Sequence, residues 1–269
     1  MLRKCAEIWD EVRAKTPLVH CITNYVTIND VANIILAGGA SPAMVENPSE
    51  SGDFARIASA LYLNLGTLTG EQELAMAEAV KGCAASGAPV IVDPVACGVI
   101  PRKVEMLKTI FINGKITCIK GNGAEIKSLA GLDAMARGVD SLEQGEGVEQ
   151  ACRVLAEKEK VIVAATGPVD VVADGNNIAY IDNGTTLFSS ITGAGCMVGG
   201  VVAACIGAVP SEPWLASITG LIAFNIAGER AAQISGGNPG SFRSLLFDKL
   251  YNLRGEDILK EARVEWEKK

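Results

Sequence analysis

Hydrophobic and polar residues follow one another along this chain in blocks that predict alternating strands and helices. Short apolar runs rich in β-branched residues are typical of buried strands, and longer segments with helical spacing lie between them. The predicted strands are Leu18 to Thr23, Pro42 to Val45, Leu61 to Leu65, Pro89 to Asp93, Ile116 to Lys120 and Val161 to Ala165. The predicted helices are Met1 to Lys15, Asn29 to Leu36, Gly52 to Ala60, Glu71 to Ala85, Arg102 to Phe111, one starting near Gly123, and Val148 to Lys158. This alternation predicts a parallel sheet covered by helices on both faces.

The pattern changes after Thr166. The runs Val169 to Ala173 and Asn177 to Ile181 flank the turn Asp174-Gly175 and predict a hairpin, so antiparallel strands are expected at one edge of the sheet. Beyond Ser190 the pattern is almost wholly helical. We therefore predict an α/β fold with a central, mostly parallel sheet, helices on both faces and a short antiparallel edge.

A single domain over residues 1–269 is expected, because no repeat, linker or change of composition divides the chain. The glycine-rich, charged segment Gly131 to Gly147 is predicted to be a surface excursion. In open parallel sheets, ligands bind beyond the carboxyl ends of the strands. The residues in those places are Asn24, Met44, Asp93, Asn122 to Glu125 and Thr166.

Composition and charge exclude several classes of protein. Hydrophobic residues make up 49% of the chain, enough for a large core, and the net charge of −7 argues against a nucleic-acid partner. No apolar run reaches the roughly 18 residues that a membrane span needs, and the N-terminal segment does not resemble a signal peptide. The eight cysteines never form a CxxC pair and mostly lie in apolar runs, so we expect reduced core residues in a cytoplasmic protein.

Because His20 is the single histidine of the chain, further classes of enzyme are excluded. A zinc protease with an HExxH motif and a zinc site with three histidines both need more histidines than the chain has. A Ser-His-Asp triad would have to use His20, and the sequence has no GxSxG motif to supply the serine.

The turn Thr192 to Cys196 precedes an apolar helix, Met197 to Ala208. Its glycines, Gly193 and Gly195, let several backbone N–H groups point at one place, and the helix N-terminus adds a partial positive charge. Such a turn is suited to bind a phosphoryl group during its transfer. A tight helix entry with glycines for close packing is the simpler alternative.

Two carboxylates lie at predicted strand ends. Asp93 ends one apolar strand, and Glu125 closes the sequence Asn122-Gly123-Ala124-Glu125 after the next. Together they could hold a hydrated Mg²⁺, which favours one or two carboxylates with water and phosphate oxygens. Alternatively, Asp93 caps a turn and Glu125 lies in the first turn of a helix, where carboxylates are common.

Lys120 and the dipeptide Thr166-Gly167 could complete a phosphate site. A lysine at a strand end can neutralise a phosphate, and a Thr-Gly turn can offer it a hydroxyl and a free N–H. A surface lysine and an ordinary turn are the alternatives.

Taken together, these motifs resemble the two signatures of the ribokinase-like superfamily, Asn122-x-x-Glu125 and Gly193-Ala194-Gly195-x. Within it, the chain is similar to the hydroxyethylthiazole kinase family from about Pro17 to about Ala232. The segments that carry this similarity are Pro17-Leu-Val-His-Cys-Ile-Thr-Asn24, Ser41-Pro-Ala-Met44, Val92-Asp-Pro-Val-Ala-Cys-Gly98 and Thr192-Gly-Ala-Gly-Cys-Met197.

The resemblance implies an enzyme that transfers the γ-phosphoryl group of ATP to the hydroxyethyl group of 4-methyl-5-(2-hydroxyethyl)thiazole, for thiamine biosynthesis or salvage. It implies a homotrimer whose thiazole pocket is shared between subunits. By position, the implied thiazole contacts are Met44 and Gly193, with Asn24 in the same pocket; the ATP contacts are Lys120 and Thr166; and the carboxylates that organise Mg²⁺ are Asp93 and Glu125. The family often has arginine where this chain has Lys120, so a bidentate phosphate contact is lost.

Cys196 occupies the place where most of the superfamily has an aspartate as catalytic base, and cysteine there is typical of this family. Because a helix N-terminus lowers the pKa of a thiol, we expect Cys196 to act as a weak thiolate base. Its contribution should be smaller than that of the anion site, since phosphoryl transfer needs little activation of the nucleophile.

Two alternatives remain at this point. One is another ribokinase-like kinase for a small alcohol, of the hydroxymethylpyrimidine or pyridoxal type. The other is a ligand-binding protein on the same fold that has lost catalysis.

Overall fold

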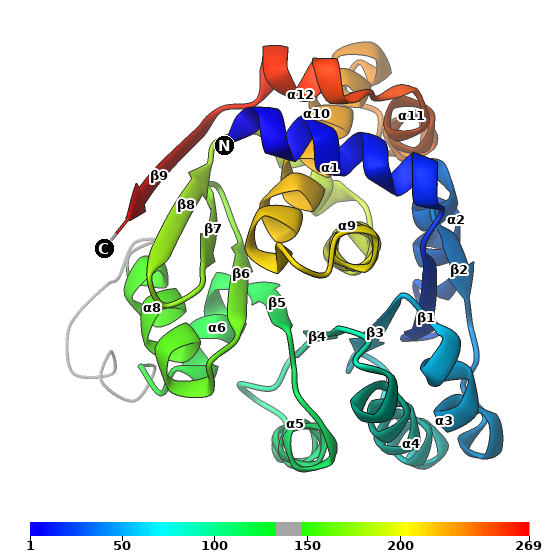
Figure 1. The fold of residues 1–269 in the computed structure, drawn as a ribbon. Coiled ribbons are helices and arrows are strands. Elements are labelled where there is room, and N and C mark those ends of the chain that lie inside the picture. Colours follow the sequence, from blue (N-terminus) through cyan, green and yellow to red (C-terminus); the bar gives the residue numbers. More distant parts are fainter. Residues whose placement is uncertain (133–146, 269) are drawn as a thin grey trace.

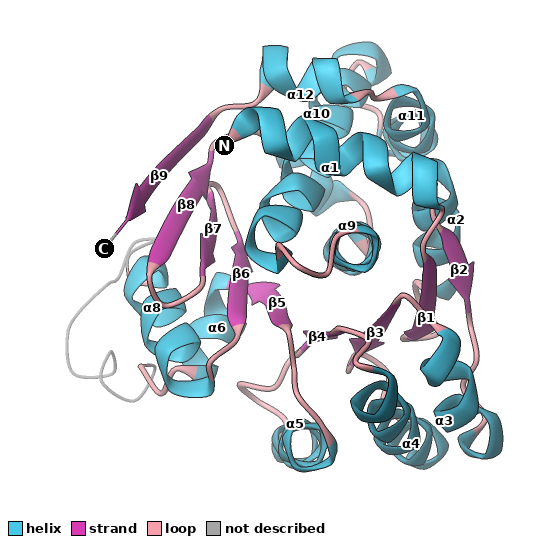
Figure 2. Ribbon diagram, in the orientation of Figure 1, coloured by secondary structure: helices cyan, strands magenta, loops and turns pink. Residues whose placement is uncertain are grey.

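A nine-stranded sheet forms the centre of the molecule (Figures 1 and 2). The computed structural model describes residues 1–132 and 147–268. The sheet order is β2-β1-β3-β4-β5-β6-β7-β8-β9. The bounds are β1 Leu18–Ile22, β2 Ser41–Ala43, β3 Ala60–Asn64, β4 Val90–Asp93, β5 Cys118–Asn122, β6 Ile162–Thr166, β7 Asp170–Ala173, β8 Asn177–Ile181 and β9 Val264–Lys268. Strands β1 to β6 are parallel and the last three are antiparallel, so the predicted fold class is confirmed.

Helices cover both faces of the sheet (Figure 1). On one face lie α1 Leu2–Lys15, α2 Ile28–Gly38, α9 Ala194–Ala208, α10 Pro213–Ser235, α11 Pro239–Asn252 and α12 Gly255–Glu261. On the other lie α3 Pro48–Ile57, α4 Gly70–Ser86, α5 Pro101–Asn113, α6 Gly123–Leu129 and α8 Val148–Glu159. A short 3₁₀ helix, Thr186–Ser190, leads into α9.

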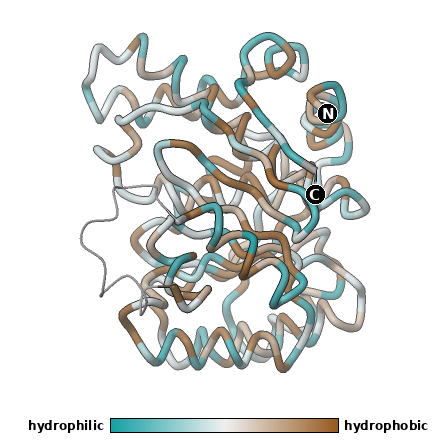
Figure 3. The backbone as a smooth tube through the Cα atoms, turned by 90° about the vertical axis from the view of Figure 1, so that its left-hand side faces the viewer, coloured by the Kyte–Doolittle hydropathy of each residue, from teal (hydrophilic) through white to brown (hydrophobic). Residues whose placement is uncertain are grey.

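Each face has its own buried hydrophobic cluster, and successive strand residues contribute to them in turn because side chains alternate across a sheet. In β3, for example, Ala60 and Tyr62 face α9, whereas Leu61 and Leu63 face α4. Figure 3 shows hydrophobic stretches through the middle of the molecule and hydrophilic ones on its outer helices. No helix in the described ranges is long and apolar enough to cross a membrane.

The predicted elements are confirmed with small shifts of their ends, and the hairpin is found as β7 and β8. The prediction that the chain is helical after Ser190 is wrong at its end, because β9 pairs antiparallel with β8 at the sheet edge. The predicted excursion Gly131 to Gly147 lies almost entirely outside the described residues.

Candidate active site

Polar residues of three neighbouring strands lie on the face of the sheet that α9 covers. The alternation that directs Tyr62 toward α9 does the same for Asn64, which ends β3. Asp93 follows Ile91 at the same spacing in β4, and Lys120 follows Cys118 in β5. Because β3, β4 and β5 are adjacent and parallel, these side chains meet beneath the first turn of α9.

That first turn begins at Gly193, which caps α9 in the left-handed conformation with φ 83°. A side chain there would be strained, and its Cβ would lie 2.5 Å from Cγ2 of Thr27. Glycine is therefore required both by the backbone and by the neighbouring side chain. The first N–H groups of a helix have no partner inside it, so this turn offers donors to an anion, as the sequence predicts.

Asp93 and Lys120 form an ion pair beneath this turn. The Lys120 Nζ lies 3.2 Å from Asp93 Oδ2, and both side chains are only 3% exposed. Burial raises the pKa of Asp93, and the charge of Lys120 opposes that rise. Burial alone would lower the pKa of Lys120, but the negative charge of Asp93 raises it overall, so the lysine is an ammonium. This ammonium also donates to the Gly195 carbonyl at 2.9 Å, so Lys120 is a buried residue beneath the turn and not a surface lysine.

The thiol of Cys196 is held by two buried amides. Nδ2 of Asn24 lies 3.3 Å from Sγ, and Nδ2 of Asn64 lies 3.2 Å from it. Asn24 follows β1 and Asn64 ends β3, and between these strands the chain changes direction across the sheet. Such a switch point is where ligands bind in open α/β sheets.

The lowered pKa predicted for Cys196 from the helix N-terminus is wrong. Burial is the largest influence and the negative charge of Asp93 the next, and together they raise the pKa of this thiol. Thr27, Lys120 and Asn24 lower it by less. Cys196 is therefore a neutral thiol near neutral pH.

Glu125 connects two loops at the same edge. It forms a capping box with Asn122, whose side chain accepts from the Glu125 N–H while Glu125 Oε2 accepts from the Asn122 N–H at 2.8 Å. Glu125 Oε1 accepts from the N–H of Ala96, in the loop after β4, at 3.0 Å. Its negative charge contributes to the raised pKa of Asp93, so the two carboxylates repel one another in a way that a bound cation would relieve.

Thr166 ends β6 beside Asn122, which ends β5. Its hydroxyl donates to the Gly121 carbonyl at 3.3 Å. The N–H of Gly167 is not free, as the sequence pattern suggested, because it donates to Oδ1 of Asp170 at 2.9 Å. The other oxygen of Asp170 accepts from Nδ2 of Asn225, on α10, at 2.8 Å. Asp170 thus connects the Thr166-Gly167 turn to Asn225 on α10 by one hydrogen bond on each side.

Asp170 should make the protein less stable as the pH rises, the opposite of the usual effect of an ion-paired carboxylate. Burial raises its pKa to about 6, so the folded protein binds this proton more tightly than the unfolded chain does. Its contribution to stability is then fully present below the ordinary carboxyl range and is lost as the pH rises through about 6. We expect wild type to lose roughly 1–2 kcal/mol relative to Asp170→Asn between about pH 4 and about pH 7.5.

Urea unfolding of both proteins at the two pH values measures this difference. Asp53→Asn, at a side chain that is 88% exposed, is the control for removing a carboxylate. If the free energy of unfolding of wild type rises relative to that of Asp170→Asn as the pH increases, the pKa of Asp170 is not raised by folding.

Met44 follows β2 and packs, half-buried, against the cluster on the α9 face. The ring of His20 lies in contact with the backbone beside it, with Nε2 2.7 Å from the Val45 carbonyl. The structure thus brings Met44 to the same edge as Asn24, Asp93, Lys120 and Thr166.

Tyr62, Asn64 and Asp170 were not identified from the sequence. Asn64 could have been found, because it is a polar residue at the end of an otherwise apolar strand. Tyr62 carries no such signal, since tyrosine is common within strands. Asp170 lies at the start of a predicted strand, where its link to Asn225 on α10 depends on the tertiary fold.

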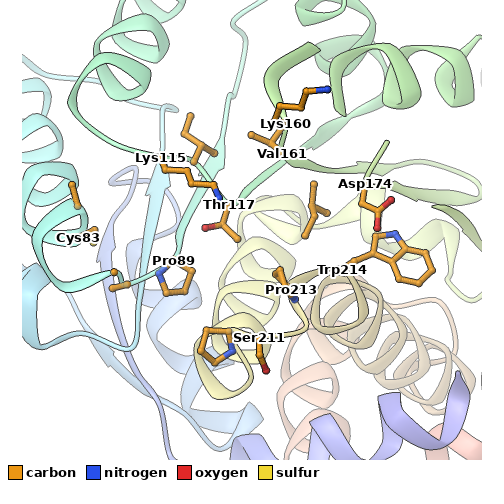
Figure 4. Close-up of a pocket in the computed structure, with 16 residues that line it drawn as sticks. Cys83, Pro89, Lys115, Thr117, Lys160, Val161, Asp174, Ser211, Pro213 and Trp214 are labelled. Atoms are coloured by element: carbon orange, nitrogen blue, oxygen red, sulfur yellow. The ribbon is translucent and has the colours of Figure 1, made fainter. Parts of the chain in front are cut away.

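A cavity of about 850 Å³ lies at the opposite edge of the sheet (Figure 4). It opens at the amino ends of β4, β5 and β6, and Lys115, Lys160 and Trp214 are among its lining residues. None of the site residues that the sequence predicts lines this cavity. The polar network, in contrast, lies at the carboxyl ends of the strands. Among the described residues, no group of three histidine, cysteine, aspartate or glutamate side chains could by itself hold a metal ion.

Comparisons with known proteins identify the family of this chain. Residues 9–256 match the sequence profile of the Hydroxyethylthiazole kinase family. The chain is 66% identical over 266 residues to a hydroxyethylthiazole kinase of Syntrophomonas wolfei, covering 99% of this chain and 100% of that one. The structure of a hydroxyethylthiazole kinase protein from Pyrococcus horikoshii is similar with a TM-score of 0.89 and 33% identity, covering 98% and 99% of the two chains. A ribokinase-like superfamily protein from Enterococcus faecalis shares the fold, with a TM-score of 0.61 and 10% identity over 90% and 93% of the chains.

Proposed function

This chain belongs to the hydroxyethylthiazole kinase family, and on that premise we propose that it transfers the γ-phosphoryl group of ATP to the hydroxyethyl group of 4-methyl-5-(2-hydroxyethyl)thiazole. The observation that carries the proposal is the first turn of α9, the N-terminus of an apolar helix whose Gly195 carbonyl accepts from the buried Lys120 of the pair with Asp93. A helix N-terminus supported by a buried ammonium stabilises the negative charge of a phosphoryl group in transfer. The product belongs to thiamine biosynthesis or salvage.

The thiazole alcohol is proposed to bind at the switch point between β1 and β3. Gly193 offers its backbone to the alcohol beside Thr27, Met44 supplies an apolar contact, and Asn24 lines the pocket. The thiol of Cys196 is directed to this place by the two amides, which supports its position next to the reacting hydroxyl. Because the thiol is neutral, it orients the alcohol and accepts its proton only weakly.

The nucleotide is proposed to lie over β5 and β6. Lys120 contributes the positive charge and Thr166 its hydroxyl, with the turn held by Asp170. Asp93 and Glu125 fit a hydrated Mg²⁺ that arrives with ATP, because they are the kind and number of ligands that this ion takes from protein alongside phosphates. When bound, the ion neutralises phosphate charge. The chain itself orients both substrates and excludes water around the buried pair.

A homotrimer is proposed, with the thiazole pocket at the contact between subunits. The support is that Tyr25 and Val26, directly after Asn24, are 52% and 62% exposed in the single chain. Apolar side chains next to a binding site are typical of a surface that a partner covers. A cytoplasmic location is proposed as well, supported by eight free cysteines of which only Cys196 is not buried.

Replacing Cys196 by aspartate should keep or raise turnover, because a carboxylate is a better proton acceptor than a neutral thiol and the two amides can donate to it. Cys196→Ala should lose less than about tenfold, since positioning and charge dominate this reaction. Turnover at saturating ATP and thiazole alcohol measures both. A large loss in Cys196→Asp would show that the sulfur itself is needed.

The proposed function is tested with purified protein, Mg-ATP and a panel of thiazole, pyrimidine and pyridoxine alcohols, following ADP release. The expected result is release that depends on the thiazole alcohol and is far weaker with the others. Preference for a pyrimidine or pyridoxine alcohol would favour another ribokinase-like kinase. No release with any alcohol would favour a ligand-binding protein.

A further inference from the structure

Tyr62 lies at the centre of the buried network without taking part in any contact that the proposed reaction requires. Its side chain is fully buried in β3. Its hydroxyl lies 3.0 Å from the Cys196 carbonyl and 3.3 Å from Asp93 Oδ2, and it accepts from Asn64 Nδ2 at 3.3 Å. A phenol has one hydrogen, so the hydroxyl donates to either the carbonyl or the carboxylate at a time.

The same carboxylate oxygen is also contacted by Lys120, which donates to the Gly195 carbonyl. When the Tyr62 hydroxyl donates to the Cys196 carbonyl, the nearer of its two acceptors, two consecutive carbonyls of the first turn of α9 are bound from the sheet: that of Gly195 by Lys120 of β5 and that of Cys196 by Tyr62 of β3. One connection would fix the distance of the turn from the sheet. Two connections to adjacent residues also fix its rotation about the helix axis, and hence the direction of its free N–H groups.

The contact between α9 and the ring is unusually close. Gly199 lies one turn further along the helix, and a Cβ there would be 2.4 Å from the Tyr62 hydroxyl and 2.7 Å from the ring carbon that bears it. Only a glycine lets the helix lie directly on the phenol, which is independent support for a fixed relation between this ring and this turn.

We infer that Tyr62 is a positioning residue for phosphoryl transfer, whose hydroxyl joins β3 to the Cys196 carbonyl in the first turn of α9 and sets the direction of the anion-binding N–H groups. The inference rests on the proposed function of that turn. Tyr62 touches no substrate, because it is wholly covered. Its effect therefore falls on the transition state, where the N–H groups must match the phosphoryl oxygens, more than on substrate binding.

The test is Tyr62→Phe, which keeps the ring and removes only the hydroxyl. We expect kcat to fall about tenfold, the size typical of losing one hydrogen bond, with KM for the thiazole alcohol within about twofold of wild type. Tyr180→Phe is the matched control, because Tyr180 lies in β8 and packs against the cluster on the other face of the sheet. A Tyr62→Phe enzyme with wild-type kcat, or with a raised KM alone, would overturn the inference.

A second comparison shows whether Tyr62 affects catalysis through the backbone of Cys196 or through its sulfur. Because Tyr62 contacts the carbonyl of Cys196, Tyr62→Phe should lower kcat by the same factor in the Cys196→Asp variant as in wild type. An effect that disappears in that background would mean that Tyr62 acts through the thiol, and would overturn the inference.

Amide hydrogen exchange gives a readout that needs no substrate. The Met197 amide donates to the Gly193 carbonyl at 2.8 Å, and its exchange should be faster in Tyr62→Phe and unchanged in Tyr180→Phe; unchanged exchange in both would count against the inference. An inactive wild type would instead refute the proposed function while exchange still tests the role of Tyr62. If Tyr62→Phe does not fold, Gly199→Ala serves as the second variant, because it keeps the hydroxyl but displaces it and should also lower kcat.

Discussion

Lys120→Met is expected to lower the free energy of unfolding by about 3–5 kcal/mol and to reduce turnover by at least about a hundredfold. The stability loss follows from burial. Both side chains of the pair are only 3% exposed, so removing the ammonium leaves the Asp93 carboxylate charged and unpaired inside the protein. The loss of turnover follows from the missing bond to Gly195 and from the missing positive charge near the phosphates.

The double variant Asp93→Asn with Lys120→Met distinguishes these two effects. It removes both charges, so most of the stability should return while turnover stays low. Lys4→Met is the control for losing a lysine from an ion pair, because Lys4 is 58% exposed beside Glu212 and should cost less than about 1 kcal/mol. Urea unfolding and ADP release measure the two quantities. A double variant as unstable as Lys120→Met would show that the unpaired carboxylate is not the cause.

Gly193→Ala is expected to reduce turnover by about a hundredfold, because a shift of the anion-binding turn by a fraction of a bond length misaligns both substrates. Backbone strain and a steric clash both disfavour a side chain at this position. The backbone has φ 83°, which disfavours any side chain by about 1 kcal/mol, and the new Cβ would lie 2.5 Å from Cγ2 of Thr27.

Gly87→Ala measures the effect of backbone strain without a steric clash. Gly87 has φ 81° at the end of α4, and a methyl group added there would meet nothing within 4 Å, so its replacement should affect stability slightly and turnover not at all. Thr27→Ser removes the clashing methyl group and should restore part of the activity of Gly193→Ala. If Gly193→Ala is as active as Gly87→Ala, the turn does not have to lie as close to Thr27 as the structure has it.

Much of the candidate site could be predicted from the sequence because its residues follow apolar strands. Asp93, Lys120, Asn122 and Thr166 stand at or next to the ends of such runs, and a parallel sheet brings those ends to one edge. The glycine turn before an apolar helix predicted the anion site for a similar local reason.

The contacts among these residues could not be predicted. Lys120 was expected to face a phosphate, yet its ammonium also supports Gly195 and pairs with Asp93. The N–H of Gly167 was expected to be free, and a carboxylate three residues later accepts from it. The pKa of Cys196 was expected to be low, but burial and Asp93 raise it. The predictions for Gly167 and Cys196 are wrong because each depends on which side chains the fold brings next to the group and on how deeply it is buried.

The sequence by itself determined the order of strands and helices as far as β8, and which polar residues stand at the carboxyl ends of the strands. These follow from the period of the hydrophobic pattern and from turn chemistry, which are local properties of the chain. Only the tertiary structure decided that α9 lies against Tyr62, that Asn24 and Asn64 meet at one sulfur, and that β9 closes the antiparallel edge. Those features join residues that are far apart in the sequence, or depend on the helix that covers a strand, and no local pattern encodes such contacts.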